Sequence, residues 1–175
     1  MKKISILKFE ILSTIFISML GTLLHFTFEW SNNNPLVGIF SAVNESTWEH
    51  LKLLFFPMSI TTIIGHFYYK DTIPNYLCSK TKGIIIALLF IIIFFYTYTG
   101  VIGENIAILN IGSFFISVIL GEYYTYKKIK NNSPCNNLIA IIILLILCIC
   151  FILFTFFPPH IGLFLDPVTN KFGIK

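Results

Sequence analysis

Five long apolar runs, separated by short polar segments, constrain the fold of this chain more than any other feature. A helix that crosses a bilayer needs roughly 20 mostly apolar residues, and its backbone polar groups must be bonded within the helix. The 175-residue chain is 56% hydrophobic, which is more than a soluble domain uses. The sequence predicts an all-α, polytopic transmembrane helix bundle forming one integral membrane domain over residues 1–175. The expected helices are 6–28, 44–69, 83–102, 106–126 and 137–157, followed by a short tail at 158–175.

The lysines predict the orientation of this bundle. All 12 basic residues are lysines, and nine of them flank the predicted helices on one side. These are Lys2, Lys3, Lys8, Lys70, Lys80, Lys82, Lys127, Lys128 and Lys130. An excess of lysine marks cytoplasmic loops, so we expect a cytoplasmic N-terminus and a C-terminus outside. The absence of Arg and the abundance of Ile, Asn and Lys indicate a bacterial plasma membrane.

The same lysines also limit the expected partners. They form small clusters and leave no extended basic surface, which argues against binding to nucleic acid. The lipid bilayer is the expected partner. A protein partner in the membrane, or a second copy of the chain, is required by only some of the functions considered below.

The four cysteines predict neither a disulfide framework nor a zinc ribbon, because no CxxC spacing is present. Cys78 and Cys135 fall in segments expected in the cytoplasm, and Cys148 and Cys150 fall inside an apolar run. We expect all four to be small buried residues.

The most polar stretch of the chain, residues 40–57, opens the second predicted helix. It brings Asn44, Glu45, Glu49, His50 and Lys52 into nine positions of a protein in which only 11% of residues are charged. The four residues from Ser46 to Glu49 fit a capping box, which would start the helix there. Pro57 lies inside the same run, where a kink is expected.

Most ionisable side chains fall at the predicted outer ends of the helices. Ionisable groups at membrane depth are costly, and they usually mark a functional site. Histidine together with carboxylates suits zinc or another divalent transition metal, although no HExxH signature is present. The predicted metal ligands are His25, Glu29, His50, His160 and Asp166. The predicted catalytic residues are Glu45, Glu49 and His50, and the predicted ligand-binding residues are Asn44, Trp48, Lys52 and Glu104.

Helix geometry leaves this site with two arrangements. At roughly 100° per residue, Glu45, Glu49 and Lys52 share one face, and His50 points about 140° away from Glu45. Either the carboxylates face the site, or His50 faces it with help from an irregular helix start.

Packing roles compete with each functional role. Glu49 can complete the capping box, and either Glu45 or Glu49 can pair with Lys52. His25 and Glu29 can form a pair that fixes the first helix, and Asp166 before Pro167 can start a turn. Glu122 marks a second polar position at the inner side, for which hydrogen-bonded packing is the expected role.

Residues 43–57, which read VNESTWEHLKLLFFP, resemble the signature of a domain-of-unknown-function family of small bacterial membrane proteins. The resemblance extends to His25-Phe26, to residues 29–31, to residues 96–100 with Gly103, and to the ending at 166–174. Phe172 stands where the family pattern has a tyrosine, and Gly162 where it has a proline. The resemblance implies no activity.

Three functions are compatible with the sequence. The first is a membrane-embedded, metal-dependent hydrolase acting on a lipid or envelope substrate. The second is an ion-binding or small-ligand-binding component of transport, for which five helices would need to oligomerise. The third is a structural partner in a larger membrane complex, with the polar groups joining helices.

Overall fold

The computed structural model describes residues 4–132 and 134–174, so Lys2 and Lys3, which the orientation prediction used, lie outside the described residues. It is an all-α bundle, as predicted. The elements are α1 (Ile6–Trp30), α2 (Pro35–Gly38), α3 (Thr47–Tyr69), α4 (Tyr76–Ile102), α5 (Ala107–Lys130), α6 (Asn137–Phe156) and the 3₁₀ helix η1 (Gly162–Phe164). Five of them are long and apolar enough to cross a membrane, and these are α1, α3, α4, α5 and α6.

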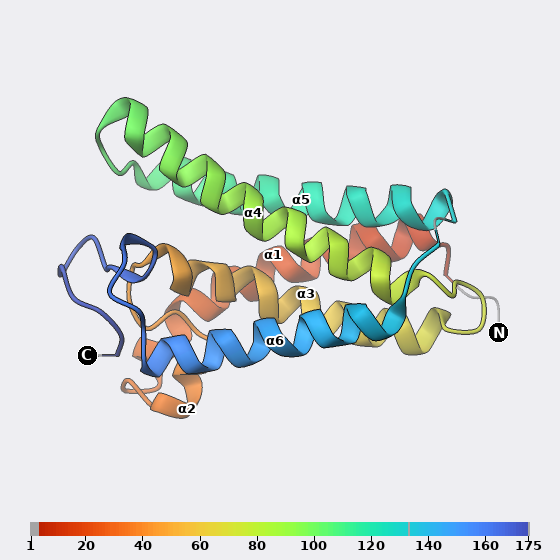
Figure 1. Ribbon diagram of the computed structural model, residues 1–175, viewed down its shortest axis with the longest axis horizontal. Coiled ribbons are helices and arrows are strands. Elements are labelled where there is room, and N and C mark those ends of the chain that lie inside the picture. Colours follow the sequence, from red (N-terminus) through yellow and green to blue (C-terminus); the bar gives the residue numbers. More distant parts are fainter. Residues whose placement is uncertain (1–3, 133, 175) are drawn as a thin grey trace.

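The five long helices run along the long axis of the molecule, with the two chain ends at opposite ends of it (Figure 1). We call the end that holds Trp30, Thr47, Ile102 and Phe156 the motif end. The opposite end, where α1 begins and α5 ends, carries Lys8, Lys70, Lys82, Lys127, Lys128 and Lys130, and we call it the lysine end. Which end faces the cytoplasm stays a prediction.

Helix α3 lies at the centre of the bundle and contacts α1, α4, α6 and η1. It is the most buried of the five long helices. Its apolar side chains, with those of the neighbouring helices, form the main core, which includes Ile17, Leu54, Met58, Ile84, Val118 and Phe151. The helix continues through Pro57 as one element, and the kink expected there stays a prediction.

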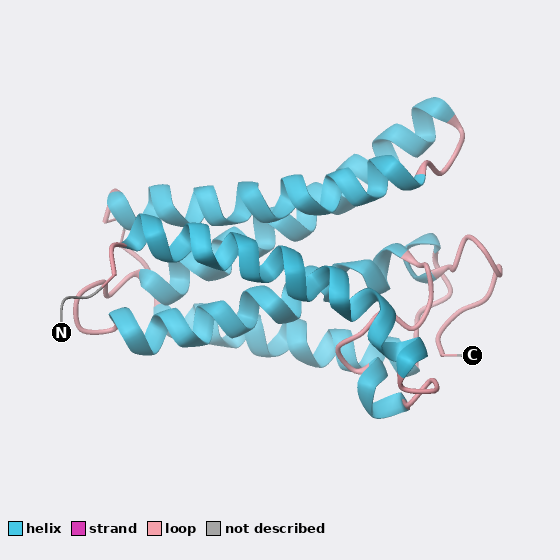
Figure 2. Ribbon diagram, turned by 180° about the vertical axis from the view of Figure 1, so that it is seen from behind, coloured by secondary structure: helices cyan, strands magenta, loops and turns pink. Residues whose placement is uncertain are grey.

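Helices α4 and α5 form the most extensive helix pair, and their hairpin diverges from the other helices toward the motif end (Figure 2). A Cβ atom on Gly83 would lie 2.5 Å from the carbonyl oxygen of Gly121, so the two backbones are in contact. Small residues permit such close approach in membrane bundles, where lipid gives no hydrophobic driving force.

One helix boundary and one additional helix correct the sequence prediction. Helix α4 begins at Tyr76, so the expectation of a loop up to Lys82 was wrong. Lys80 did not end the helix because its charge is buried and paired within the bundle. The connection after α1 also contains a short helix, α2, which Asn34 caps by accepting a hydrogen bond from the Leu36 amide at 2.9 Å.

The tail after α6 folds back onto the motif end. The ring of Phe164 is buried and lies 4.8 Å from the ring of Trp48. The side-chain amide of Asn44 donates to the carbonyl of Gly173 at 2.9 Å. The tail therefore forms part of the surface around the start of α3.

Candidate metal centre

The sequence around Ser46 fixes how α3 begins. The hydroxyl of Ser46 accepts from the Glu49 amide at 3.4 Å, which makes Ser46 the N-cap. Asn44 in turn accepts from the Ser46 amide at 2.9 Å. Glu45 thus stands just outside the helix, where the 100° spacing of helical residues does not apply. The irregular start removes the angular conflict between Glu45 and His50.

Three side chains converge at the motif end. Two come from helices α1 and α3, and the third comes from the connection between α2 and α3. The Nε2 atoms of His25 in α1 and His50 in α3 lie 3.2 Å apart. The two Glu45 carboxylate oxygens lie 3.7 Å from His25 Nε2 and 3.4 Å from His50 Nε2. Within residues 4–132 and 134–174, this is the one group of three His, Cys, Asp or Glu residues whose ligand atoms all lie within 4.8 Å of one another.

The backbone assigns the tautomer of His50. Its Nδ1 lies 2.9 Å from the carbonyl oxygen of Ser46, which can only accept a hydrogen bond. The neutral ring therefore carries its proton on Nδ1 and presents the lone pair of Nε2 to His25 and Glu45. This is the second-sphere arrangement that orients a histidine as a metal ligand.

The spacing of the three groups fits a tetrahedral ion. Two ligands about 2.0–2.1 Å from zinc at a tetrahedral angle lie roughly 3.3 Å from each other. The observed separations of 3.2, 3.4 and 3.7 Å cluster around that value. The two nitrogen–oxygen separations are longer than the usual 2.7–3.2 Å of an N–H···O bond. The group is therefore arranged more like a ligand set than like a hydrogen-bonded network.

The group is accessible on one side. The side chains of His25, His50 and Glu45 are 32%, 31% and 47% exposed. The adjacent His25 imidazole, and secondarily that of His50, lowers the pKa of Glu45 below its usual range. Glu45 therefore stays an anion at neutral pH. Two imidazoles and a carboxylate with one open side match the ligand set of catalytic zinc sites.

Glu49 and Lys52 form a separate, buried ion pair. Lys52 Nζ lies 2.6 Å from Glu49 Oε2, and it also donates to the Gly38 carbonyl at 2.7 Å and to the Thr155 hydroxyl at 2.8 Å. Glu49 accepts in addition from the Val43 amide at 3.0 Å and from Thr155 at 3.2 Å. Of the two carboxylates considered as partners of Lys52, Glu49 therefore forms the pair. This ion pair and its hydrogen bonds join α2, α3 and α6. Only the Ser46 half of the predicted capping box forms.

The other predicted site residues lie outside the group of three. Glu29 is exposed at the last turn of α1, and Glu104 is exposed in the turn after α4. His160 stacks on Phe172 with ring centres 4.6 Å apart. Asp166 accepts from the Val168 amide at 2.9 Å and from the Thr169 hydroxyl at 2.6 Å, which is the turn role considered for it. The structure thus brings together His25, His50 and Glu45 from the predicted set.

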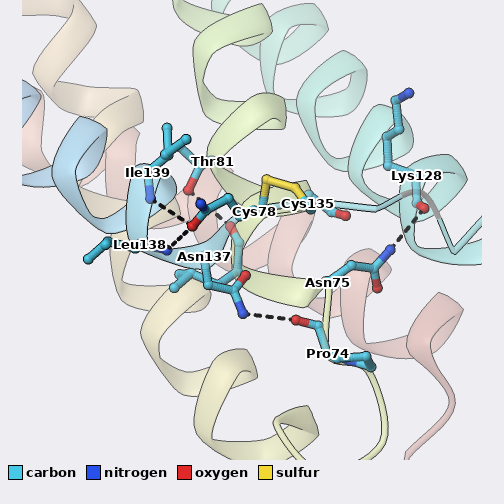
Figure 3. Close-up of a disulfide and its surroundings, with 12 residues drawn as sticks. Pro74, Asn75, Cys78, Thr81, Lys128, Cys135, Asn137, Leu138 and Ile139 are labelled. Atoms are coloured by element: carbon cyan, nitrogen blue, oxygen red, sulfur yellow. Dashed lines mark hydrogen bonds between the residues drawn. A yellow bond between two sulfur atoms is a disulfide. The ribbon is translucent and has the colours of Figure 1, made fainter.

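The structure also contains a disulfide that the sequence analysis did not expect. Cys78, in the first turn of α4, is bonded to Cys135, just before α6, with Cα atoms 6.0 Å apart (Figure 3). The prediction of no disulfide was wrong because α4 begins earlier than expected and carries Cys78 to the α5–α6 connection. Asn75 and Asn137 bond across the same region, to the carbonyls of Lys128 and Pro74 (Figure 3). A pair 57 residues apart has no local signature.

A second polar cluster lies at the lysine end, and only its Glu122 member was predicted to take part in hydrogen-bonded packing. Lys80 is buried between Glu10 of α1 and Glu122 of α5. Glu10 and Glu122 are carboxylates within apolar runs, and this position in the sequence indicates that each needs a buried partner. Lys80 was assigned to a loop, so no partner for them was expected.

Comparison with known proteins identifies the family of the chain. A model of a family of unknown function, DUF6512, matches residues 1–174. The chain belongs to this family. The DUF6512 match covers both the motif end and the lysine end, so the metal candidate and the buried cluster lie within the matched region. No curated protein and no solved structure matched the chain.

Proposed function

We propose that this DUF6512 protein binds one divalent transition metal ion, with zinc the best fit, through His25, Glu45 and His50. The observation that carries the proposal is the separation of 3.2–3.7 Å among ligand atoms from three different segments. Two imidazoles and one carboxylate form a set of borderline and hard donors that suits zinc, without the thiolates of structural sites. The Ser46 carbonyl supports the set by fixing the ring of His50.

We propose further that the reaction is hydrolysis of an ester or amide in a lipid or envelope molecule. Three protein ligands leave the fourth position of a tetrahedral ion for water or substrate, and the ion would lower the pKa of that water toward 7. Water adds to the carbonyl carbon, the bond to the leaving oxygen or nitrogen breaks, and the leaving group takes the proton. In this proposal the motif end faces outward from a bacterial plasma membrane.

An apolar groove beside the site supports a lipid substrate. It has a volume of about 580 Å³ and is lined by residues of α1 and α5, including Thr22, Phe26, Trp30 and Phe115. Phe26, which lines the groove, follows His25 in α1, and the rings of the two residues lie 5.0 Å apart. An acyl chain in this groove would bring its polar end to the open side of the site.

Metal binding without turnover is the second candidate function. It is favoured by the engagement of Glu49, one of the predicted catalytic residues, with Lys52 and Thr155. In this case the site would hold an ion for transport or for stability.

Metal content of the purified protein tests the proposal. We expect about one equivalent of zinc in the wild type and in His160→Ala, the matched control whose side chain is exposed and outside the group. We expect loss of the metal in His25→Ala and His50→Ala, with melting temperatures close to that of the metal-free wild type. A wild type that takes up no metal, or a His50→Ala variant that keeps it, would refute the site.

Turnover separates the two candidate functions. Zinc-loaded wild type and His50→Ala are compared on ester-linked and amide-linked lipids in vesicles. Hydrolysis by the wild type alone supports the hydrolase, and stoichiometric metal without hydrolysis supports binding alone.

A further inference from the structure

A carboxylate–lysine–carboxylate triad at the lysine end is independent of the metal candidate. Lys80 Nζ lies 2.8 Å from Glu10 Oε2 and 2.5 Å from Glu122 Oε2. Glu10, Lys80 and Glu122 are 3%, 0% and 2% exposed. Three helices, α1, α4 and α5, each contribute one member. The close contact of α4 and α5 at Gly83 and Gly121, beside Lys80 and Glu122 in sequence, holds two of these members together.

The charges of this triad do not balance. Two ionised carboxylates and one ammonium group leave one net negative charge in a buried site, and an uncompensated buried charge costs several kcal/mol. The Oε1 atoms of both Glu10 and Glu122 are buried and have no hydrogen-bond partner within residues 4–132 and 134–174. An ionised carboxylate seldom leaves a buried oxygen unbonded. One further positive charge would neutralise the site.

The titratable groups around the triad do not supply that charge. The buried phenol of Tyr76 on α4 and that of Tyr69 on α3 lie within electrostatic reach of Glu10, and both are neutral at neutral pH. His66, on the last turn of α3, packs its ring against Phe67. Lys8 and Lys82 lie two residues from members of the triad, a spacing that places them on other faces of α1 and α4. Tyr123 and Tyr126 on α5 line the cavity described next.

We propose that Glu10 and Glu122 bind one exchangeable proton, shared between the two carboxyl groups and held beside Lys80. A proton on either carboxyl group adds no heavy atom to the buried site, and it can reside on an Oε1 atom that has no other partner among the described residues. A metal cation would need about six oxygen ligands and would be repelled by Lys80. The proton neutralises the triad, so the ligand of this site is H⁺.

The position of the triad gives the proton a short route. Glu10 is the fifth residue of α1, and Lys80 is the fifth residue of α4, so both lie only about 7 Å along the helix from the lysine end. A cavity of about 290 Å³ is lined by residues of α1 and α5, including both Glu10 and Glu122. The site therefore exchanges its proton with the aqueous side at the lysine end.

Infrared spectroscopy of the purified protein tests this site directly. A protonated carboxyl group has a C=O stretch that is separate from carboxylate bands and shifts in deuterium oxide. We expect this band in the wild type at neutral pH and its loss on alkaline titration. Glu10→Gln and Glu122→Gln should each lack the band, because each leaves one carboxylate balanced by Lys80. Glu29→Gln, which changes an exposed carboxylate of the same helix, should keep it.

Stability gives a second, independent test. Each single variant should melt within a few degrees of the wild type, since an amide replaces a protonated carboxyl group of similar shape. The double variant Glu10→Gln, Glu122→Gln should melt far lower, because Lys80 is then buried without a partner. A wild type without the carboxyl band at neutral pH would overturn the proposal, and a melting temperature that rises with sodium in its place would assign the missing charge to a metal cation.

Discussion

At the scale of single residues, the N-cap of α3 divides one polar motif into two sites. Glu45 precedes Ser46, and its side chain lies beside the histidines. Glu49 and Lys52 follow Ser46, and their side chains are buried in the interior. A helical projection treats these residues as one face because it assumes helical backbone throughout. The Asn44 and Ser46 hydrogen bonds break that assumption at one residue.

The buried pair of Glu49 and Lys52 should be a strong determinant of stability. Lys52→Met leaves the Glu49 carboxylate buried without its cation, which costs about 3–5 kcal/mol. We expect a large drop in the melting temperature of Lys52→Met in detergent. The double variant Glu49→Gln, Lys52→Met should recover much of the loss, since no charge is then left unpaired. Equal destabilisation of the single and double variants would contradict the pairing.

Glu45 should contribute a small, pH-dependent stability to the metal-free protein. Its pKa is lowered in the folded state, so its contribution is present above the unfolded value of about 4.3 and is lost as the pH falls from there toward the folded value. Glu45→Gln should therefore melt slightly below the wild type at pH 7, and the difference should close at low pH. The effect is small because the side chain is half exposed. A difference that grows as the pH falls below about 4.3 would contradict the assigned direction.

At the scale of helices, the contact of Gly83 with Gly121 determines how closely α4 and α5 approach. A Cβ on Gly121 would lie 2.9 Å from the Gly83 carbonyl oxygen, so Gly121→Val must separate the backbones. We expect a loss of more than about 1 kcal/mol, as for other overpacked sites. Gly112→Val on the same helix is the control, since nothing lies within 4 Å of a Cβ there. Equal melting temperatures for the two variants would show that this contact is unimportant.

At the scale of the whole molecule, the sequence predicts the bundle well and its polar pairs poorly. Apolar runs determine which segments are spanning helices, because lipid demands that length and composition. Lys80 was expected in a loop because a lysine next to an apolar run is typical of a topology signal. Its carboxylate partners lie 70 and 42 residues away, so no local pattern identifies them. His25, Glu45 and His50 were each predicted as site residues, but their grouping depends on a backbone turn that periodicity does not describe.

The disulfide of Cys78 and Cys135 should stabilise the lysine end. It closes a connection of 57 residues that includes α5, and loss of such a link typically costs about 2–4 kcal/mol. A reductant should lower the melting temperature of the oxidised wild type, while Cys78→Ser should be insensitive to it. Cys148→Ser, which changes a free cysteine, should behave like the wild type. A wild type unaffected by reductant would contradict a stabilising role.

The most direct test of the central claim is X-ray absorption spectroscopy at the zinc edge of the metal-loaded protein. We expect two imidazole nitrogens and oxygen donors at roughly 2.0–2.1 Å in the wild type, and no bound zinc in His25→Ala or in His50→Ala. A first shell containing sulfur at roughly 2.3 Å would place the ion at cysteines. That result, or a shell without imidazole, would contradict a metal centre made of His25, Glu45 and His50.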